Sequence, residues 1–236
     1  MDGFTPLGFD QWFRLFLPVS ASSLARLPNK LDTLAYLRYL TIAKTDRAVL
    51  RNYTVRAYRG DGPEGPELDI DFVLHGTPAD GTSGPAATWA QECRPGDPVA
   101  LLDEGIGYNP TPERGARTLL VGDETALPAI AGILASLPRT TIGAALIEVP
   151  RPDDVQEVDA PAGVEVQWVV RNDPQAVPGA AVSAAAEVAP VPTEPFSAWV
   201  AGEQSLVSDV RRHWVRAGVP KDAIAFTGYW KHSGRH

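Results

Sequence analysis

The second half of the chain alternates strand-like and helix-like segments, and this alternation constrains the fold more than any other feature. Apolar strands that alternate with helices predict a parallel sheet with helices on both faces. Such sheets bind ligands at the carboxyl ends of their strands, where the strand order reverses. The expected strands are 117–122, 141–149, 164–171, 196–202 and 223–230, and the expected helices are 125–137, 179–187 and 204–217.

The first 103 residues have a different pattern, in which short strand-like runs are separated by turns rich in glycine and proline. This pattern predicts an antiparallel barrel or sandwich. The expected strands are 12–17, 50–58, 68–75 and 98–102, with a helix over 31–40. Turn residues then indicate a linker. The expected domains are a β domain over 1–103, a linker over 104–116 and an α/β domain over 117–236.

The composition is that of an ordinary globular protein, with 44% hydrophobic and 21% charged residues among 236. No run approaches the roughly 18 apolar residues of a membrane span, so no stable membrane insertion is expected. The N-terminus, MDGFTPLGFD, lacks the basic start and apolar core of a signal peptide. A cytoplasmic location is therefore expected.

The charge is distributed unevenly along the chain. The net charge of −8 argues against a general nucleic-acid-binding protein. Residues 211–236 hold six lysines and arginines against Asp222 alone, a local charge of +5, which leaves −13 for residues 1–210. On composition alone, a solvated basic surface is the simpler interpretation of this C-terminal segment.

Cys93 is the only cysteine, which excludes disulfides, iron–sulfur clusters and cysteine zinc sites within the chain. We interpret it as a small core residue rather than a nucleophile. The four histidines form no H-E-x-x-H pattern, and His232 and His236 lie at the extreme end of the sequence, so no metal site is expected.

The segment R-N-Y-T-V-R at 51–56 is unusually polar for a strand. By alternation, Arg51 and Tyr53 point to one side, and Thr54 and Arg56 point to the other. A flavin dinucleotide needs this mixture, since it offers a pyrophosphate to arginine, a flat ring to an aromatic side chain, and ring atoms N5 and O4 to a hydroxyl or backbone donor. Alone, the short R-x-Y-T pattern is weak.

A second candidate element follows this strand. D-F-V-L-H-G at 71–76 is expected to form a strand, and G-P-A-A-T-W-A-Q-E-C at 84–93 is expected to start a helix near Ala86–Thr88. Small residues let the backbone approach a phosphate, and the free N–H groups of a helix start favour anions. Taken alone, an ordinary Gly-Pro helix start is the simpler interpretation.

These two elements continue into an ordered series of motifs. G-D-E-T-A-L-P-A-I follows at 122–130, W-V-A-G-E at 199–203 and G-Y-W at 228–230. The series, from about Gly8 to Trp230, resembles the siderophore-interacting protein family, the flavin-dependent ferric-siderophore reductases of the ferredoxin–NADP reductase-like superfamily. The resemblance implies an N-terminal antiparallel Greek-key β-barrel that binds FAD, followed by a parallel-sheet α/β domain that binds a nicotinamide cofactor. Family members usually have further strands before the position of Gly8, so the first barrel strands are expected to be missing here.

The resemblance also implies roles for particular residues. Arg51 would lie near phosphate, Thr54 near the flavin edge, and Tyr229 and Trp230 close to the flavin, although both aromatics also fit an ordinary core role. The implied cofactor-binding residues of the first domain are Arg51, Tyr53, Thr54, Val55, Arg56, Asp71, His75, Gly76, Gly84, Pro85, Ala86, Ala87, Thr88 and Trp89. Those of the second domain are Gly122, Asp123, Glu124, Thr125, Ala126, Gly202, Glu203, Tyr229 and Trp230.

The chemistry that the resemblance implies needs no catalytic side chain. The nicotinamide cofactor gives a hydride to flavin N5, and the reduced flavin passes electrons singly to siderophore-bound Fe(III), which releases Fe(II). Because ferric siderophores are often anionic, the basic C-terminal segment becomes a docking patch, with Lys231 and Arg235 as substrate contacts. Two alternatives stay open: a flavin oxidoreductase for another acceptor (a partner protein, quinone or free flavin), and a non-catalytic siderophore-binding module. A ferredoxin-like protein is an alternative electron donor.

The choice between NADPH and NADH depends on the end of the second α/β strand. An acidic residue there holds the ribose 2′-OH, whereas an arginine accepts a 2′-phosphate. Both types are present, as Glu148 and Arg151, and Arg171 at the end of the third strand would add a second cation. Two cations against one carboxylate favour NADPH. If the protein instead prefers NADH, Glu148 is the expected specificity residue.

Overall fold

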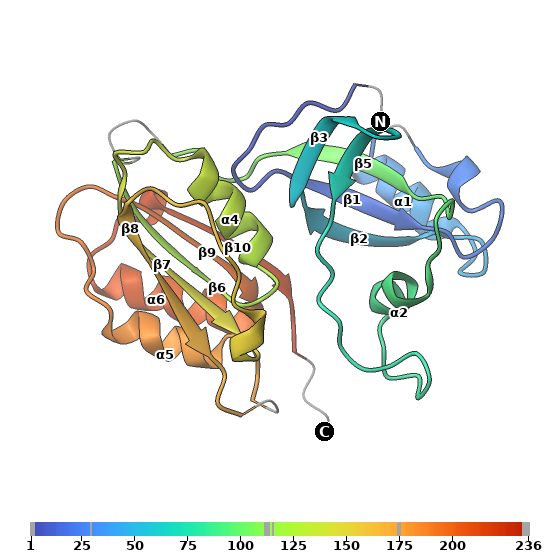
Figure 1. Cartoon of the computed structure of the whole chain (residues 1–236). Coiled ribbons are helices and arrows are strands. Elements are labelled where there is room, and N and C mark those ends of the chain that lie inside the picture. The colour runs from blue at the N-terminus through green and yellow to red at the C-terminus, as the bar shows by residue number, and fades with distance from the viewer. Residues whose placement is uncertain (1–2, 29, 111–113, 115, 174–175, 233–236) are drawn as a thin grey trace. The chain divides into compact units, whose positions relative to one another are not determined.

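The computed structural model describes residues 3–28, 30–110, 114, 116–173 and 176–232 (Figure 1). The chain forms two compact units. One contains Trp12–Gly105, and the other contains Pro6–Gln11 together with Ile106–His236. Among the described residues, no helix is long and apolar enough to cross a membrane.

The first unit contains a three-stranded antiparallel sheet in the order β2-β1-β5. The central strand β1 (Trp12–Leu17) pairs with β2 (Val49–Thr54) on one side and with β5 (Ala100–Gly105) on the other. β2 is therefore an edge strand, which explains the polarity of R-N-Y-T-V-R: Arg51 and Asn52 are exposed.

Both faces of β1 are covered, which explains why its sequence is almost continuously apolar. The helices of this unit are η1 (Leu24–Arg26), α1 (Thr33–Thr41) and α2 (Pro85–Glu92). On one face, Leu15 packs in a cluster with Ala86 of α2. On the other, Phe16 packs with Tyr39 of α1. Asp32 begins α1 by accepting a hydrogen bond from the backbone of Ala35, as an N-cap residue does.

The strand predicted over 50–58 is wrong as a single element. It is divided into β2 and β3 (Ala57–Gly62), and β3 forms a separate hairpin with β4 (Gly65–Asp69). The division occurs because the backbone N–H of Arg56 turns to the carbonyl of Asp69, at 3.0 Å, and leaves the ladder with β1.

The strand predicted over 68–75, which includes D-F-V-L-H-G, is also wrong beyond Asp69. β4 ends there, and residues 70–75 are not in a strand. Phe72 packs between Tyr53 and Trp89, while Leu74 is 56% exposed. Side-chain packing, rather than a partner strand, fixes this segment. β-propensity alone could not reveal the missing partner.

Two smaller predictions in the first unit also differ from the structure. The strand predicted over 98–102 is β5, which begins at Ala100 and ends at Gly105, inside the predicted linker of residues 104–116. Cys93 is exposed, so the prediction of a core residue is wrong. It lies at the C-cap of α2, whose buried residues are at the other end of the helix, at Ala86 and Ala87.

The second unit is built on a five-stranded sheet in the order β10-β9-β6-β7-β8, with every pair parallel. Its strands are β6 (Arg117–Gly122), β7 (Ile142–Val149), β8 (Gly163–Val170), β9 (Ser197–Glu203) and β10 (Ile224–Trp230). Its helices are α4 (Leu127–Ser136), η2 (Pro152–Asp154), α5 (Ala180–Val188), α6 (Gln204–Arg216) and η3 (Lys221–Ala223). The predicted strands and the three longer helices are confirmed here.

Helices cover both faces of the parallel sheet (Figure 1). Leu120 and Trp199 pack with α4, whereas Val121 and Val200 pack with α5 and α6 on the other face. The strand order reverses between β6 and β9, so the carboxyl ends of these two strands mark the switch point at which such sheets bind ligands. The predicted fold class, an antiparallel β region followed by a parallel α/β region, is confirmed.

Candidate functional site

The edge strand β2 carries the first group of predicted site residues. Arg51 is exposed, Thr54 is buried, and the ring of Tyr53 lies 4.6 Å from that of Phe72. Burial raises the pKa of Tyr53 to about 12, with the Arg51 guanidinium acting in the opposite direction. The tyrosine is therefore a neutral hydrogen-bonding group at physiological pH, beside a permanent cation.

The residues after β2 form the corner between the two sheets of the first unit. Val55 packs with the cluster around Phe13, and the Nε of Arg56 lies 3.3 Å from a carboxylate oxygen of Asp71. Burial raises the pKa of Asp71, and Arg56 lowers it. Arg56 and Asp71 are thus brought together, and each is directed at the other.

The start of α2 is a group of backbone donors without a side-chain cap. Gly84 occupies the N-cap position in an extended conformation, and no side chain accepts from the first turn. Pro85 follows, and the next two residues are buried alanines. The backbone N–H of Thr88 is already bonded to the carbonyl of Gly84, at 2.8 Å. The earlier N–H groups lack intrahelical partners, as at any helix start, and suit an anion.

The loop before α2 packs closely against this helix start. A Cβ atom on Gly84 would lie 2.9 Å from the imidazole carbon Cε1 of His75. Gly76 has a φ of +64°, and a Cβ there would lie 2.5 Å from Thr82. Trp89 lies behind the helix start, with its ring 6.0 Å from that of Phe72. The structure therefore brings His75 and Gly84 together, with Gly76 next to His75 in the chain and close to Thr82. That these residues bind a dinucleotide stays a prediction.

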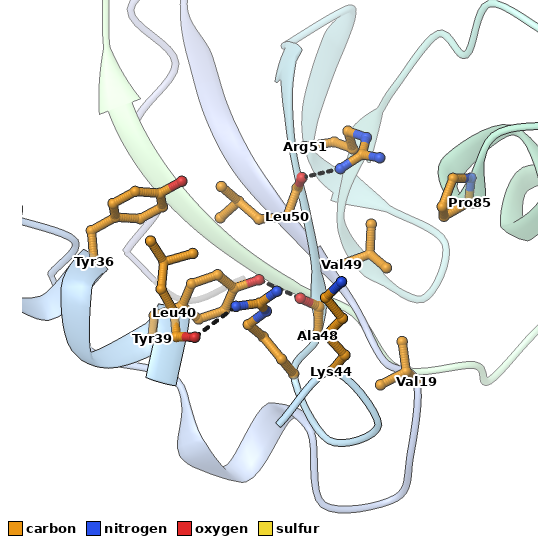
Figure 2. A pocket seen from close by; sticks show the side chains of 11 residues that line it. Val19, Tyr36, Tyr39, Leu40, Lys44, Ala48, Val49, Leu50, Arg51 and Pro85 are labelled. Carbon is orange, nitrogen blue, oxygen red and sulfur yellow. Dashed lines mark hydrogen bonds between the residues drawn. The ribbon is translucent and has the colours of Figure 1, made fainter. Parts of the chain in front are cut away.

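Arg51 of β2 and Pro85 of α2 line the same cavity, although they lie far apart in the sequence (Figure 2). The predicted donor that lines it is the exposed guanidinium of Arg51, which suits the charge of a pyrophosphate. Pro85 itself has no N–H, but it brings the uncapped start of α2 to the edge of the same cavity. Sequence reasoning missed several other residues that line this cavity, namely Tyr36, Leu40, Lys44 and Arg47. The only signal for them was the nearness of two cations to R-N-Y-T-V-R.

Asp123 joins the ends of three strands at the switch point of the parallel sheet. Its carboxylate accepts hydrogen bonds from the backbone of Thr125 at 2.9 Å, the backbone of Glu203 at 2.6 Å and the indole of Trp230 at 3.3 Å. Burial raises its pKa, and these hydrogen bonds oppose the rise. Gly202 is required beside it, because a Cβ would lie 2.5 Å from the carboxylate at a φ of +132°.

Glu203 fixes the backbone beyond β9 and β10. Its carboxylate accepts hydrogen bonds from the backbone and hydroxyl of Ser205 and from the backbone of His232, the last at 3.0 Å. Burial alone would raise the pKa of Glu203, but the hydrogen bonds from Ser205 and His232 bring it below its usual value. The remaining members of the motif lie close by: Gly122 ends β6, and Ala126, which is fully buried, is the N-cap of α4.

Arg171 is not available as a cation for a 2′-phosphate, so that prediction is wrong. It is buried, its Nη2 donates to Glu124 at 2.6 Å, and its Nε lies 3.3 Å from Glu148. Burial raises the pKa of Glu124, and the hydrogen bond from Arg171 opposes the rise. Glu148 is fully buried and accepts from two backbone N–H groups at the start of α5, so its alternative role as an NADH determinant is also wrong.

The C-terminal strand presents part of its aromatic pair to solvent. Tyr229 is 39% exposed, so a core role for it is excluded, whereas Trp230 is half-buried through its bond to Asp123. Lys231 is exposed, and Arg235 lies outside the described residues. Within the basic segment, Asp222 is paired with Arg114, at 2.9 Å.

An antiparallel β unit followed by a parallel α/β unit is the arrangement of proteins with a ferredoxin reductase-like fold. The chain belongs to the siderophore-interacting protein family. The family model "Siderophore-interacting protein" matches residues 115–233, and "Siderophore-interacting FAD-binding domain" matches residues 1–106. The predicted family is confirmed.

Two curated relatives are similar over most of the chain. The ferric vibriobactin reductase ViuB of Vibrio cholerae is 34% identical over 223 residues, which cover 92% of this chain and 75% of that protein. The NADPH-dependent ferric-chelate reductase of Escherichia coli is 26% identical over 250 residues, which cover 98% of this chain and 83% of that protein.

Solved structures support the same fold. A siderophore utilization protein from T. fusca matches with a TM-score of 0.72 and 28% identity, covering 99% of this chain and 84% of that chain. The ferredoxin reductase in carbazole 1,9a-dioxygenase matches with a TM-score of 0.64 and 17% identity, covering 97% of this chain and 62% of that chain. The second likeness concerns the fold alone.

Proposed function

We propose that this protein is a flavin-dependent ferric-siderophore reductase that passes electrons from NAD(P)H through FAD to siderophore-bound Fe(III) and so releases Fe(II). The observation that carries the proposal is the common cavity of Arg51 and Pro85, which joins two predicted phosphate-binding elements within the FAD-binding domain of this family. The names of two reductase relatives support the same reaction class.

The side chains of the first unit would bind and orient the flavin. Arg51 and the start of α2 would hold the pyrophosphate, while Tyr53 and Thr54 would meet the flavin ring and its edge. FAD, when bound, supplies the chemistry that converts a hydride into single electrons. No catalytic side chain is needed, so this chain's own contribution is orientation, charge and exclusion of water.

The carboxyl edge of the parallel sheet would receive the nicotinamide cofactor. Asp123 holds the turn after β6 against Gly202 and Trp230, which gives this edge a fixed backbone. We favour NADPH over NADH because Arg151 is exposed just beyond β7, and because the relative from Escherichia coli is named for NADPH. A ferredoxin-like protein is the alternative donor.

The substrate would be an anionic ferric siderophore, and iron is cargo rather than a resident metal. Iron(II) binds hard oxygen ligands more weakly than iron(III), so reduction loosens the chelate without a protein ligand. The exposed Lys231, with Arg235, would attract the anion to the C-terminal segment.

A single spectroscopic experiment tests this function against its alternatives. The purified full-length protein is expected to carry a flavin spectrum, to bleach with NADPH and to regain colour with ferric siderophore. Recolouring by quinones or free flavin alone would favour an oxidoreductase with another acceptor. A protein that binds ferric siderophore but never takes up flavin would be a binding module. If only a reduced ferredoxin bleaches the flavin, the electron donor is that protein and not NAD(P)H.

A further inference from the structure

The cavity that contains Arg51 extends well beyond the predicted phosphate site. It has a volume of about 330 Å³ and is bounded by α1, the loop after it, β2 and the first residue of α2 (Figure 2). The residues that line it are Val19, Tyr36, Tyr39, Leu40, Lys44, Arg47, Ala48, Val49, Leu50, Arg51 and Pro85. All of them belong to the first compact unit.

The cavity is electropositive. Three of the eleven lining residues, Lys44, Arg47 and Arg51, carry a positive charge, and none of the eleven is acidic. The guanidinium of Arg47 is held in place, because it donates to the carbonyl of Leu40 at 2.8 Å and lies 5.7 Å from the ring of Tyr39. Arg51 donates to the carbonyl of Leu50 at 2.7 Å. Such a lining suits a phosphorylated ligand.

One wall of the cavity is flat and aromatic. The ring of Tyr36 is tilted by only 20° from that of Tyr39, with 6.2 Å between their centres. Tyr39 is fixed, since it is buried and its hydroxyl donates to the carbonyl of Ala48. Tyr36 and Leu40 remain 40% and 42% exposed, which leaves an apolar surface beside Tyr39 available to a planar heterocycle.

We propose that this cavity binds the adenosine diphosphate half of FAD, with the adenine against Tyr36 and Leu40 and the diphosphate among Lys44, Arg47 and Arg51. This inference rests on the proposed function, because Arg51 and Pro85 are shared with the predicted pyrophosphate site. The volume lies at the lower end of the roughly 300–1,000 Å³ usual for ligand pockets, which suits half of a large dinucleotide.

A nicotinamide dinucleotide carries the same adenosine diphosphate chemistry, so the test must separate the two sources. Dissociation constants for FAD and for FMN, which lacks the adenosine half, are measured on the flavin-free full-length protein. Tyr36→Ala and Lys44→Ala are each expected to weaken FAD about tenfold, the loss expected from one stacking or charged contact, and to change FMN less than twofold. Tyr36→Phe, which keeps the ring, is expected to match the wild type.

Arg38→Ala is the matched control, because Arg38 is an exposed cation of the same helix that lines a different cavity. An unchanged ratio of FAD to FMN affinity in both Tyr36→Ala and Lys44→Ala overturns the inference alone. A second result would also overturn it. If Tyr36→Ala leaves the FAD affinity unchanged but raises the KM for NADPH when saturated with FAD, the cavity belongs to the nicotinamide cofactor. A wild type that binds no flavin removes the proposed function, and this inference with it.

Discussion

The two candidate ligand-binding edges of this protein use charge in opposite ways. At the carboxyl edge of the parallel sheet, Asp123, Glu148 and Glu203 are buried and accept hydrogen bonds from backbone N–H groups. At the β2 edge of the antiparallel sheet, Arg47 and Arg51 make hydrogen bonds to nearby carbonyls and border an open cavity. The buried acids fix loops, whereas the cations at β2 are placed to meet an anionic ligand. Substitutions at the first edge should therefore reduce stability, and those at the second should reduce ligand affinity.

The largest expected effect is at Glu148, which is fully buried and is paired with a buried arginine. Glu148→Ala removes a partner of the buried Arg171 and two hydrogen bonds to the start of α5. Breaking a buried ion pair in this way costs about 3–5 kcal/mol of unfolding free energy. Urea denaturation followed by tryptophan fluorescence measures the loss, because Trp199 and Trp214 are buried in this unit.

The control for this prediction is the exposed Glu165 on the neighbouring strand β8. Glu165→Ala should change the unfolding free energy by no more than about 0.5 kcal/mol. Equal losses in the two variants would contradict the assignment of Glu148 as a structural acid and would reopen its role in cofactor choice.

The second effect in size is the loss of flavin affinity in Arg51→Ala. A hydrogen bond to a charged group contributes about 1.5–3 kcal/mol, so the dissociation constant for FAD should rise about 10- to 100-fold with the fold intact. FAD titration of the flavin-free protein measures it, with Arg38→Ala as the control. Full flavin occupancy in a folded Arg51→Ala variant after gel filtration would contradict the assignment of Arg51 to the FAD pyrophosphate.

The two regions also differ in how far their structure could be predicted from sequence. Strands such as β6 and β9 are buried on both faces, so their apolar runs locate them within about a residue. The edge strand β2 and the hairpin β3–β4 are short and polar. Where they begin and end depends on which strands they pair with, and only the structure shows this. The single strand predicted over 50–58 failed for this reason.

The candidate site shows the same limit. Local patterns located the start of α2 and the turn of Asp123, because each is built from neighbours in sequence. The pairing of Arg171 with Glu124 joins residues 47 positions apart, and no periodicity indicates it. The aromatic wall of the cavity was missed because exposed side chains on α1 carry no burial pattern.

The third effect concerns Arg151, the exposed cation that follows directly after Pro150 at the end of β7. If it meets a 2′-phosphate, Arg151→Ala should lower kcat/KM for NADPH about tenfold, since a charge-assisted contact is lost, and leave NADH within about twofold. Stopped-flow flavin reduction with both cofactors measures this. Arg139→Ala is the control, because that exposed arginine is paired with Asp159. A faster wild-type reaction with NADH, or equal losses with both cofactors, would show that the NADPH preference is wrong.

The fourth effect is a pH dependence at Glu203. Its pKa is lowered in the folded protein, so the carboxylate contributes stability above its ordinary pKa of about 4.3 and loses it as the pH falls through the lower folded value. Glu203→Gln should cost about 1 kcal/mol at pH 7 and progressively less below pH 4. Denaturation of both proteins from pH 7 to pH 3 measures the difference. A cost that stays constant over this range would mean that the hydrogen bonds to Ser205 and His232 do not depend on the charge.

The smallest effect should be at Lys231, which tests whether exposed cations of the second unit also serve a ligand. Lys231 is a single exposed charge, and exposed charges are screened over about 10 Å at 0.1 M salt. Lys231→Ala should therefore raise the KM for an anionic ferric siderophore about two- to threefold at low salt, and hardly at all at high salt. Lys221→Ala is the matched control, because it removes another exposed lysine of the same basic segment, at η3. A shift in both variants would mean that the net charge of residues 211–236 attracts the substrate. A KM that is independent of salt and unchanged in Lys231→Ala would leave this segment a solvated surface. Arg151 would then be the one cation of the second unit for which a ligand contact is still proposed.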